Sequence, residues 1–359
     1  MSAQAWRESV CAPVRKEVFM GSAYAAAGVN IDEKMAGIEA IKKMVKRTAT
    51  SGVLSGVGPF GGMFRSPGAD AILVASTDGV GTKLKIAALA GRHDTVGQDI
   101  VNHCVNDILV QGAAPLFFMD YIGTSKINRH VISDIVAGIC KACIQNGCAL
   151  LGGETAELPG TYPSGEYDLT GTIVGSVARQ AVITGAGIRA GDLLIGLHSS
   201  GLHTNGYSLA RKAIFESAGL KVSDRFPDTR RSVADVLLAV HRSYLKPVQA
   251  LMRAVRVQGM AHITGGGFPD NLPRVLPKGL CAEVHRAAWT VPAVFRFIQE
   301  QGRVDRDEMY RVFNMGIGMV IMVRDADAAA ALAALGRAGE KPAIIGRMVK
   351  GGPAVRLLG

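Results

Sequence analysis

The segment Ser76-Thr77-Asp78-Gly79-Val80-Gly81-Thr82-Lys83 says more about this chain than any other stretch. It follows an apolar run, Ala71 to Ala75, that has the pattern of a buried strand. Glycines let backbone N–H groups approach an anion, lysine neutralises phosphate charge, and aspartate holds Mg²⁺. The segment therefore indicates a nucleoside-triphosphate site at a strand end, although a plain tight turn has the same pattern. It is not a Walker A loop, because G-x-x-x-x-G-K-[ST] occurs nowhere in the chain.

Composition limits the class of protein. A chain of 359 residues with 48% hydrophobic and 19% charged residues is typical of a soluble globular protein with two domains. No apolar run reaches the ~18 residues of a membrane span. The N-terminus lacks the pattern of a secretory signal, so we expect a cytoplasmic protein with no membrane partner. The six cysteines show no paired zinc-site spacing, and we expect them to be core residues without disulfides.

The net charge of +10 is unevenly distributed. Residues 1–176 carry 15 basic and 16 acidic side chains, whereas residues 177–359 carry 25 and 14. The arginines of the second half are scattered and form no basic run, so we expect no nucleic-acid partner. A phosphorylated, polyanionic substrate explains the positive charge as well.

Strand-like and helix-like segments alternate along the chain, which predicts an α/β (α+β) fold in two units. We expect a loosely ordered leader over 1–23, a first unit over 24–177 and a second over 178–359. The expected helices span 32–47, 94–112, 131–145, 207–218, 233–255, 291–301 and 326–338. The expected strands span 71–77, 115–121, 148–151, 169–177, 193–197, 316–323 and 343–349, with one more ending at Thr264.

The expected helix over 94–112 has an unusual polar face. At 100° per residue, Asp99, His103, Asn106 and Asp107 fall within a ~100° arc, and apolar residues cover the rest. This arc is either a partly exposed face or a carboxylate pair turned into a cleft to hold Mg²⁺.

Three further motifs follow strand-like segments. Gly152 to Gly160 places Glu154 behind two glycines, where it could be a metal ligand. Ser199 to Ser208 presents hydroxyls, an imidazole and an amide before a helix, which suits phosphate binding or simple helix capping. His262 to Phe268 leads into three glycines that fit the same cleft. Acidic residues, lysine and glycine loops together point to phosphoryl transfer.

With these motifs in order, the chain resembles the phosphoribosylformylglycinamidine cyclo-ligase (AIR synthetase) family from about Tyr24 to its C-terminus. The resemblance rests on AGVNI (27–31), GVGPFGG (56–62), STDGVGTKL (76–84), CVNDILVQGAAPLFFMDY (104–121), GGETAELPG (152–160), SSGLHTNGYSL (199–209), HITGGGF (262–268) and MYRVFNMGIGM (309–319).

The resemblance implies ATP-dependent ring closure of formylglycinamidine ribonucleotide to aminoimidazole ribonucleotide, with ADP and phosphate as products. ATP and Mg²⁺ are the implied cofactors. A homodimer is also implied, in which the N-terminal, ATP-binding domains pair their strands into a shared β-barrel and the C-terminal domains are ferredoxin-like.

The resemblance also implies roles for single residues. Mg²⁺ ligands would be Asp78, Asp107, Glu154 and Asp99. ATP would lie against Gly56, Gly58, Gly61, Gly62, Asp78, Gly79, Gly81, Thr82, Lys83 and Asn106. The ribotide would face Ser200, His203, Asn205, Gly265 and Gly266, and His203, Lys83 and Asp107 would be catalytic. The chain departs from related sequences at Ala25 and Asn30, and no family role attaches to His103.

Other functions have weaker support. A selenophosphate synthetase should carry a reactive cysteine in the glycine loop, and 52–62 has none. Thiamine-monophosphate kinase and the synthetase half of formylglycinamidine ribonucleotide synthase share the architecture, and the latter needs a glutaminase. A non-catalytic nucleotide sensor or a nucleic-acid-binding module would come from other classes. Asp78, Lys83, Asp107 and Glu154 argue against the sensor, and salt-sensitive nucleic-acid binding without ATP turnover would favour the module.

Overall fold

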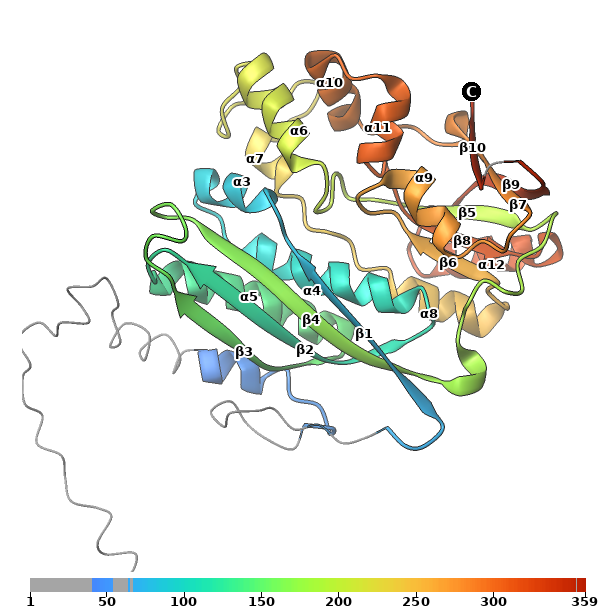
Figure 1. Cartoon of the computed structure of the whole chain (residues 1–359), viewed down its shortest axis with the longest axis horizontal. Coiled ribbons are helices and arrows are strands. Elements are labelled where there is room, and N and C mark those ends of the chain that lie inside the picture. The colour runs from blue at the N-terminus through green and yellow to red at the C-terminus, as the bar shows by residue number, and fades with distance from the viewer. Residues whose placement is uncertain (1–40, 54–63, 65–66, 353) are drawn as a thin grey trace, which may run out of the picture.

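The computed structural model describes residues 41–53, 64, 67–352 and 354–359, arranged around two separate β-sheets (Figure 1). Within that part of the chain, every helix is too short or too polar to cross a membrane. The predicted leader and the glycine loop over 56–62 lie outside the described residues.

The N-terminal sheet has four strands in the order β1-β4-β2-β3. Strands β1 and β2 are antiparallel to β4, and β2 is parallel to β3. The elements are β1 (Ala71–Gly79), α3 (Lys83–Ala90), α4 (Asp94–Leu109), β2 (Ala114–Thr124), α5 (Arg129–Asn146), β3 (Ala149–Glu157) and β4 (Tyr167–Ala178). The parallel β2–α5–β3 connection places a helix on one face of the sheet, as such crossovers do.

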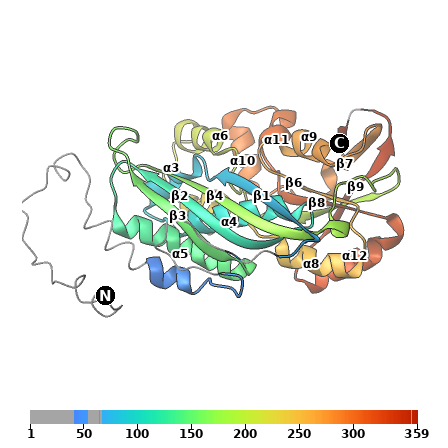
Figure 2. The same cartoon turned by 60° about the horizontal axis from the view of Figure 1, so that its bottom comes forward.

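One face of this sheet is covered by α4 and α5, and Figure 1 looks onto the other (Figures 1 and 2). Burial alternates along β4, where every second residue from Tyr167 to Val177 is buried. On the opposite face Leu73 is 59% exposed, and Met119 and Tyr121 are each 37% exposed. An apolar sheet face that the described residues leave uncovered is the kind of surface that a partner buries.

Helices α4 and α5 cross closely at two glycines. A Cβ on Gly97 would lie 2.0 Å from the carbonyl oxygen of Ile135, and a Cβ on Gly138 would lie 2.0 Å from that of Asp94. Only hydrogen fits at either position, so the backbones touch. The crossing fixes α4 against the rest of the N-terminal unit.

The C-terminal sheet has six strands in the order β10-β7-β9-β5-β8-β6. Strand β8, between β5 and β6, is buried at every residue, because helices lie on both faces (Figure 2). The elements are β5 (Leu193–His198), α6 (Tyr207–Arg211), α7 (Val233–Leu237), α8 (Leu245–Ala254), β6 (Gly259–His262), α9 (Gly267–Asn271), β7 (Leu280–His285), α10 (Ala293–Gly302), α11 (Arg306–Val312), β8 (Ile317–Val323), α12 (Ala328–Arg337), β9 (Ala343–Lys350) and β10 (Val355–Leu358).

Two predicted elements are wrong in their bounds. The single helix expected over 233–255 is two helices, α7 and α8, separated by residues 238–244. The strand expected to end at Leu151 continues as β3 through Glu154 to Glu157. Helices α3, α9 and α11 and strands β7 and β10 were not predicted. The helix expected over 32–47 is described only from residue 41, and residues 41–46 are helical.

Candidate active site

The polar arc of α4 faces the C-terminal unit. Backbone groups of residues 241–244 in that unit form hydrogen bonds with side chains of α4. Asn102 Nδ2 donates to the carbonyl of His241 at 2.7 Å, and Asn106 Nδ2 donates to that of Arg242 at 2.8 Å. The backbone N–H of His241 donates to Asp99 at 2.7 Å, and that of Tyr244 donates to Asn106 at 2.9 Å. The arc is therefore the junction between the two units.

A fully buried ion pair lies within this junction. Lys83 Nζ is 2.7 Å from Asp99 Oδ2, and both side chains are 0% exposed. The same ammonium donates to the carbonyls of His203 and Ala239, at 3.2 and 2.8 Å. Burial lowers the pKa of Lys83 and raises that of Asp99, and their mutual attraction opposes both shifts. All three ammonium protons have acceptors inside the protein.

Asp78 and Asp107 converge from different elements on His103. Asp78 is the penultimate residue of β1, and its Oδ2 lies 2.7 Å from His103 Nε2. Asp107 lies one helical turn after His103 on α4, and its Oδ2 is 3.6 Å from the same nitrogen. Burial would raise the pKa of both carboxyls, but contacts with His103 for Asp78 and with His262 for Asp107 lower it. Both are carboxylates at neutral pH.

The two carboxylates remain accessible from solvent. The side chain of Asp78 is 41% exposed and that of Asp107 is 25% exposed. Ser76 donates to Asp107 Oδ2 at 3.2 Å, and His262 Nδ1 donates to Asp107 Oδ1 at 2.7 Å. A carboxylate has about four acceptor positions, so each retains capacity for a cation. Carboxylate oxygens are hard ligands, and two carboxylates within reach of solvent suit Mg²⁺.

Four imidazoles gather behind these carboxylates. His241 Nε2 lies 3.0 Å from His262 Nε2, and the rings of His203 and His241 stack with centroids 3.9 Å apart. Thr204 Oγ1 lies 2.7 Å from His103 Nδ1. Burial lowers the pKa of His203 and His241, and neighbouring cationic groups lower it further. Burial also lowers the pKa of His262, although its contact with Asp107 opposes that shift. Burial would also lower the pKa of His103, but Asp78 and Asp107 raise it.

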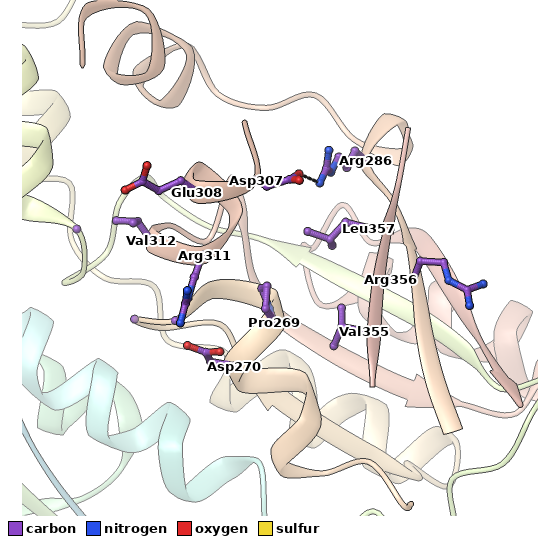
Figure 3. A pocket seen from close by; sticks show the side chains of 13 residues that line it. Pro269, Asp270, Arg286, Asp307, Glu308, Arg311, Val312, Val355, Arg356 and Leu357 are labelled. Atoms are coloured by element: carbon purple, nitrogen blue, oxygen red, sulfur yellow. Dashed lines mark hydrogen bonds and ion pairs between the residues drawn. The ribbon is translucent and has the colours of Figure 1, made fainter. Parts of the chain in front are cut away.

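Two glycine-containing loops of the C-terminal unit meet beside this junction. A Cβ on Gly265 would lie 3.0 Å from Asn205 Oδ1, so the loop after β5 touches the loop after β6. Gly206 and Gly266 both have positive φ, 77° and 92°, and both line a cavity of about 1120 Å³. Figure 3 shows Arg311 of α11 pointing toward Asp270 of α9 across this cavity. Arg286 on its far side pairs with Asp307.

A smaller cavity lies at the end of β1. Its volume is about 270 Å³, and its lining includes Gly81, Thr82, Tyr162 and Tyr167. The Thr82 hydroxyl is 3.2 Å from that of Ser208, so the cavity borders the C-terminal unit. The predicted ATP contacts Gly81 and Thr82 are thus exposed and face open space, while Gly79 lies next to them at the strand end.

The structure does not support three predicted ligand contacts on buried side chains. Lys83 and Asp99 are paired with each other and are fully buried in this arrangement. Asn106 is 0% exposed, and its amide is occupied by the backbone of 242 and 244. These side chains hold the two units together.

Glu154 does not join Asp78 and Asp107. On the helix-covered face, Asp78 is in register across the sheet with Gly171, Asp120 and Gly153. Glu154 is paired with Tyr121, and both lie on the other face. Three strand spacings, about 14 Å, separate β1 from β3. Glu154 was expected to follow a strand, but it lies within one, so alternation turns it away.

The remaining predicted residues have different outcomes. His203 is 1% exposed, with a φ of 62°, and is covered by His241 and Tyr244. Its predicted contacts with the ribotide and with the reacting atoms therefore stay predictions. Ser200 is exposed, beside Val240. Gly56, Gly58, Gly61 and Gly62 lie outside the described residues, as do Ala25 and Asn30.

Sequence reasoning missed the role of three histidines. His103 was recognised on the polar arc and given no role, although it bridges the two carboxylates. His262 was seen only as the start of a glycine loop, and His241 was not noticed. The helical spacing of His103 and Asp107 was an available signal for the first, but His241 and His262 reach the site only through the fold.

Comparisons with known proteins give the chain its relatives. Residues 61–177 match the model of the "AIR synthase related protein, N-terminal domain", and residues 189–357 match that of its C-terminal domain. The phosphoribosylformylglycinamidine cyclo-ligase of Geobacter metallireducens is 51% identical over 333 residues, which cover 92% of this chain and 96% of the relative.

Solved structures share the fold at lower identity. Thiamine-monophosphate kinase from Stenotrophomonas maltophilia superposes with a TM-score of 0.67 at 17% identity, covering 88% of this chain and 94% of the kinase. Hydrogenase maturation protein HypE in complex with ATP gives a TM-score of 0.63 at 18% identity, covering 88% of each chain.

Proposed function

The chain belongs to the phosphoribosylformylglycinamidine cyclo-ligase family, and on this premise we propose how its site is used. The enzyme closes the imidazole ring of aminoimidazole ribonucleotide from formylglycinamidine ribonucleotide in purine biosynthesis, and it consumes ATP. In the reaction, ATP phosphorylates the formyl oxygen. The amidine-side nitrogen then attacks the formyl carbon, and phosphate leaves from that carbon.

The metal and nucleotide belong at the end of β1. The convergence of Asp78 and Asp107, from β1 and α4, is the observation that carries this assignment. These two carboxylates would hold Mg²⁺, which when bound would neutralise charge on the triphosphate. Gly81 and Thr82 would lie against ATP, because they line the neighbouring cavity, and Gly79 would lie beside them at the end of β1.

The ribotide belongs on the C-terminal side of the junction. Asn205, Gly265 and Gly266 meet there beside the cavity of about 1120 Å³, and Ser200 is exposed on the same loop. Glycines with positive φ expose N–H groups to an anion such as the ribotide phosphate. Asp107 lies between the two sites, where it could act on the reacting groups.

We also propose a cytoplasmic homodimer built on the uncovered face of the N-terminal sheet. Leu73, Met119 and Tyr121 on that face favour pairing of two sheets into a shared barrel. Leu73→Lys should shift the chain from dimer to monomer in sedimentation, while Leu89→Lys, on exposed α3, should not. A dimer that survives Leu73→Lys would exclude this face. The β5–α8–β6–β8–α12–β9 order supports a ferredoxin-like C-terminal core.

The assay for the assignment is aminoimidazole ribonucleotide formation from ATP, Mg²⁺ and formylglycinamidine ribonucleotide. Asp78→Asn and Asp107→Asn should each lower kcat/KM by about a hundredfold or more, because each removes a charge at the reacting triphosphate. Asp134→Asn, at an exposed position of α5, is the matched control and should leave the rate unchanged. Full activity in Asp78→Asn would remove the metal assignment, and no product from the unaltered enzyme would refute the proposed use of the site.

A further inference from the structure

A hydrogen bond from the C-terminal unit holds one of the two carboxylates that the proposed function assigns to the cation. His262 Nδ1 lies 2.7 Å from Asp107 Oδ1, and the side chain of His262 is 3% exposed. Because an ionised carboxylate only accepts hydrogen bonds, Nδ1 carries the proton in this contact. Asp107 belongs to α4 and His262 is the last residue of β6, so the bond crosses the junction between the two units.

The two oxygens of Asp107 have different surroundings. Oδ1 is the acceptor for His262, whereas Oδ2 lies 3.2 Å from the hydroxyl of Ser76. Oδ2 is also 3.6 Å from His103 Nε2, the nitrogen that lies 2.7 Å from Asp78 Oδ2. Oδ2 is therefore the oxygen on the side of Asp78. A bond at Oδ1 fixes the rotation of the carboxylate group, and this fixes the direction in which Oδ2 points.

The ring of His262 is itself held at its other nitrogen. His262 Nε2 lies 3.0 Å from His241 Nε2, and the His241 side chain is fully buried. The backbone N–H of His241 donates to Asp99 and its carbonyl accepts from Asn102, each at 2.7 Å. A hydrogen bond at one ring nitrogen sets the proton and orientation at the other. The imidazole of His262 is thus fixed between Asp107 and a residue that the junction holds in place.

The chain after His262 runs directly into the loop that the proposed function assigns to the ribotide. Asn271, which is 3% exposed, ties this loop together from α9. Its Nδ2 donates to the carbonyl of Gly267 at 2.7 Å and to that of Gly265 at 3.2 Å. One pinned segment therefore carries both the contact to Asp107 and the glycines at the ribotide cavity.

We propose that His262 is a positioning residue, which holds Oδ1 of Asp107 and so aims Oδ2 at the cation. The inference rests on the proposed function for the place of the cation and of the ribotide. Hydrogen-bond partners of a metal-binding carboxylate contribute about 10–100-fold to metal affinity or activity. Because the ribotide loop continues from His262, the same contact sets the cation at a fixed place relative to the group that accepts the phosphoryl. Fixed placement of this kind lowers the barrier to transfer.

Two amide substitutions separate the roles of the two ring nitrogens. The Nδ2 of asparagine takes the place of Nδ1, so His262→Asn can still donate to Asp107. The amide of glutamine reaches the place of Nε2, so His262→Gln faces His241 instead. His262→Gln should lower kcat by about tenfold or more and change the KM for formylglycinamidine ribonucleotide by less than about threefold. His262→Asn should keep kcat within about threefold of the unaltered enzyme.

Two comparisons show that the effect is specific to Asp107. His130→Gln, at an exposed position of α5, is the matched control and should leave kcat unchanged. In an Asp107→Asn background, His262→Gln should cause no further loss of kcat, because it acts through that carboxylate. A purely structural role would instead lower kcat equally in both backgrounds, and that result would overturn the proposal.

Calorimetry of Mn²⁺ binding with inorganic tripolyphosphate tests the positioning without turnover. His262→Gln should weaken Mn²⁺ binding by about tenfold or more, and His262→Asn by less than about threefold. Equal losses in the two variants, no loss in His262→Gln, or no Mn²⁺ binding by the unaltered protein would each overturn the proposal. Failure of the proposed function is a separate result. It would appear as absence of product from the unaltered enzyme, while the Mn²⁺ affinities still distinguish the two variants.

Discussion

Replacing Lys83 by methionine should show whether this lysine stabilises the fold through the buried ion pair, rather than only contacting ATP as first expected. The substitution retains an unbranched apolar side chain but leaves Asp99 without its cation at 0% exposure. The carbonyls of His203 and Ala239 also lose their donor. Breaking a buried pair from one side costs about 3–5 kcal/mol. Asp99 keeps the N–H of His241, so we expect a loss of about 3 kcal/mol in the free energy of unfolding.

The matched control lies two residues along the same helix. Lys85 pairs with Glu166, and their side chains are 39% and 30% exposed. Lys85→Met should cost less than about 1 kcal/mol, because exposed pairs contribute little. Urea unfolding followed by circular dichroism, at a fixed protein concentration, measures both. An equal cost for the two variants would refute the structural role of Lys83. The double variant Lys83→Met/Asp99→Leu should recover part of the loss, because it removes the unpaired charge.

Two further predictions concern packing and pH. Gly97→Ala should destabilise the protein by about 2–3 kcal/mol, because its Cβ would overlap a carbonyl of α5. Gly336→Ala, in open space on α12, should stabilise it by about 0.5–1 kcal/mol, and thermal unfolding compares the two. Burial raises the pKa of Asp120 from 3.8 to about 7. Between these values the unfolded chain loses this proton and the folded chain keeps it, so stability falls as pH rises. In urea unfolding, the free energy of unfolding of Asp120→Asn should therefore rise relative to that of the unaltered protein from pH 4 to pH 7. A difference between the two proteins that does not change with pH would contradict the raised pKa of Asp120.

Local patterns predicted much of the architecture, since most strands and long helices have clear apolar periodicity. The polar arc of α4 was also identified correctly from helical spacing. The segment that covers this arc was not predicted, because the partners of Asn102 and Asn106 lie 139 and 136 positions away along the chain. Spacing alone could not tell that Asp99 faces a buried lysine while Asp107, two turns further along, faces solvent.

The two errors in element bounds have the same origin. Residues 241–244 leave the helical path because their backbone groups bond to Asn102, Asp99 and Asn106 instead of to each other. At Glu154, the glycines of β3 were interpreted as the end of a strand. Pairing with the whole length of β2 continues that strand and decides which face the carboxylate occupies.

The bonds between α4 and residues 241–244 have a mechanical consequence. A hinge motion that opened the two lobes would expose a charged pair and four hydrogen bonds to water at the same moment. These contacts oppose such an opening, so we expect both reactants to enter a site that the closed junction has already assembled.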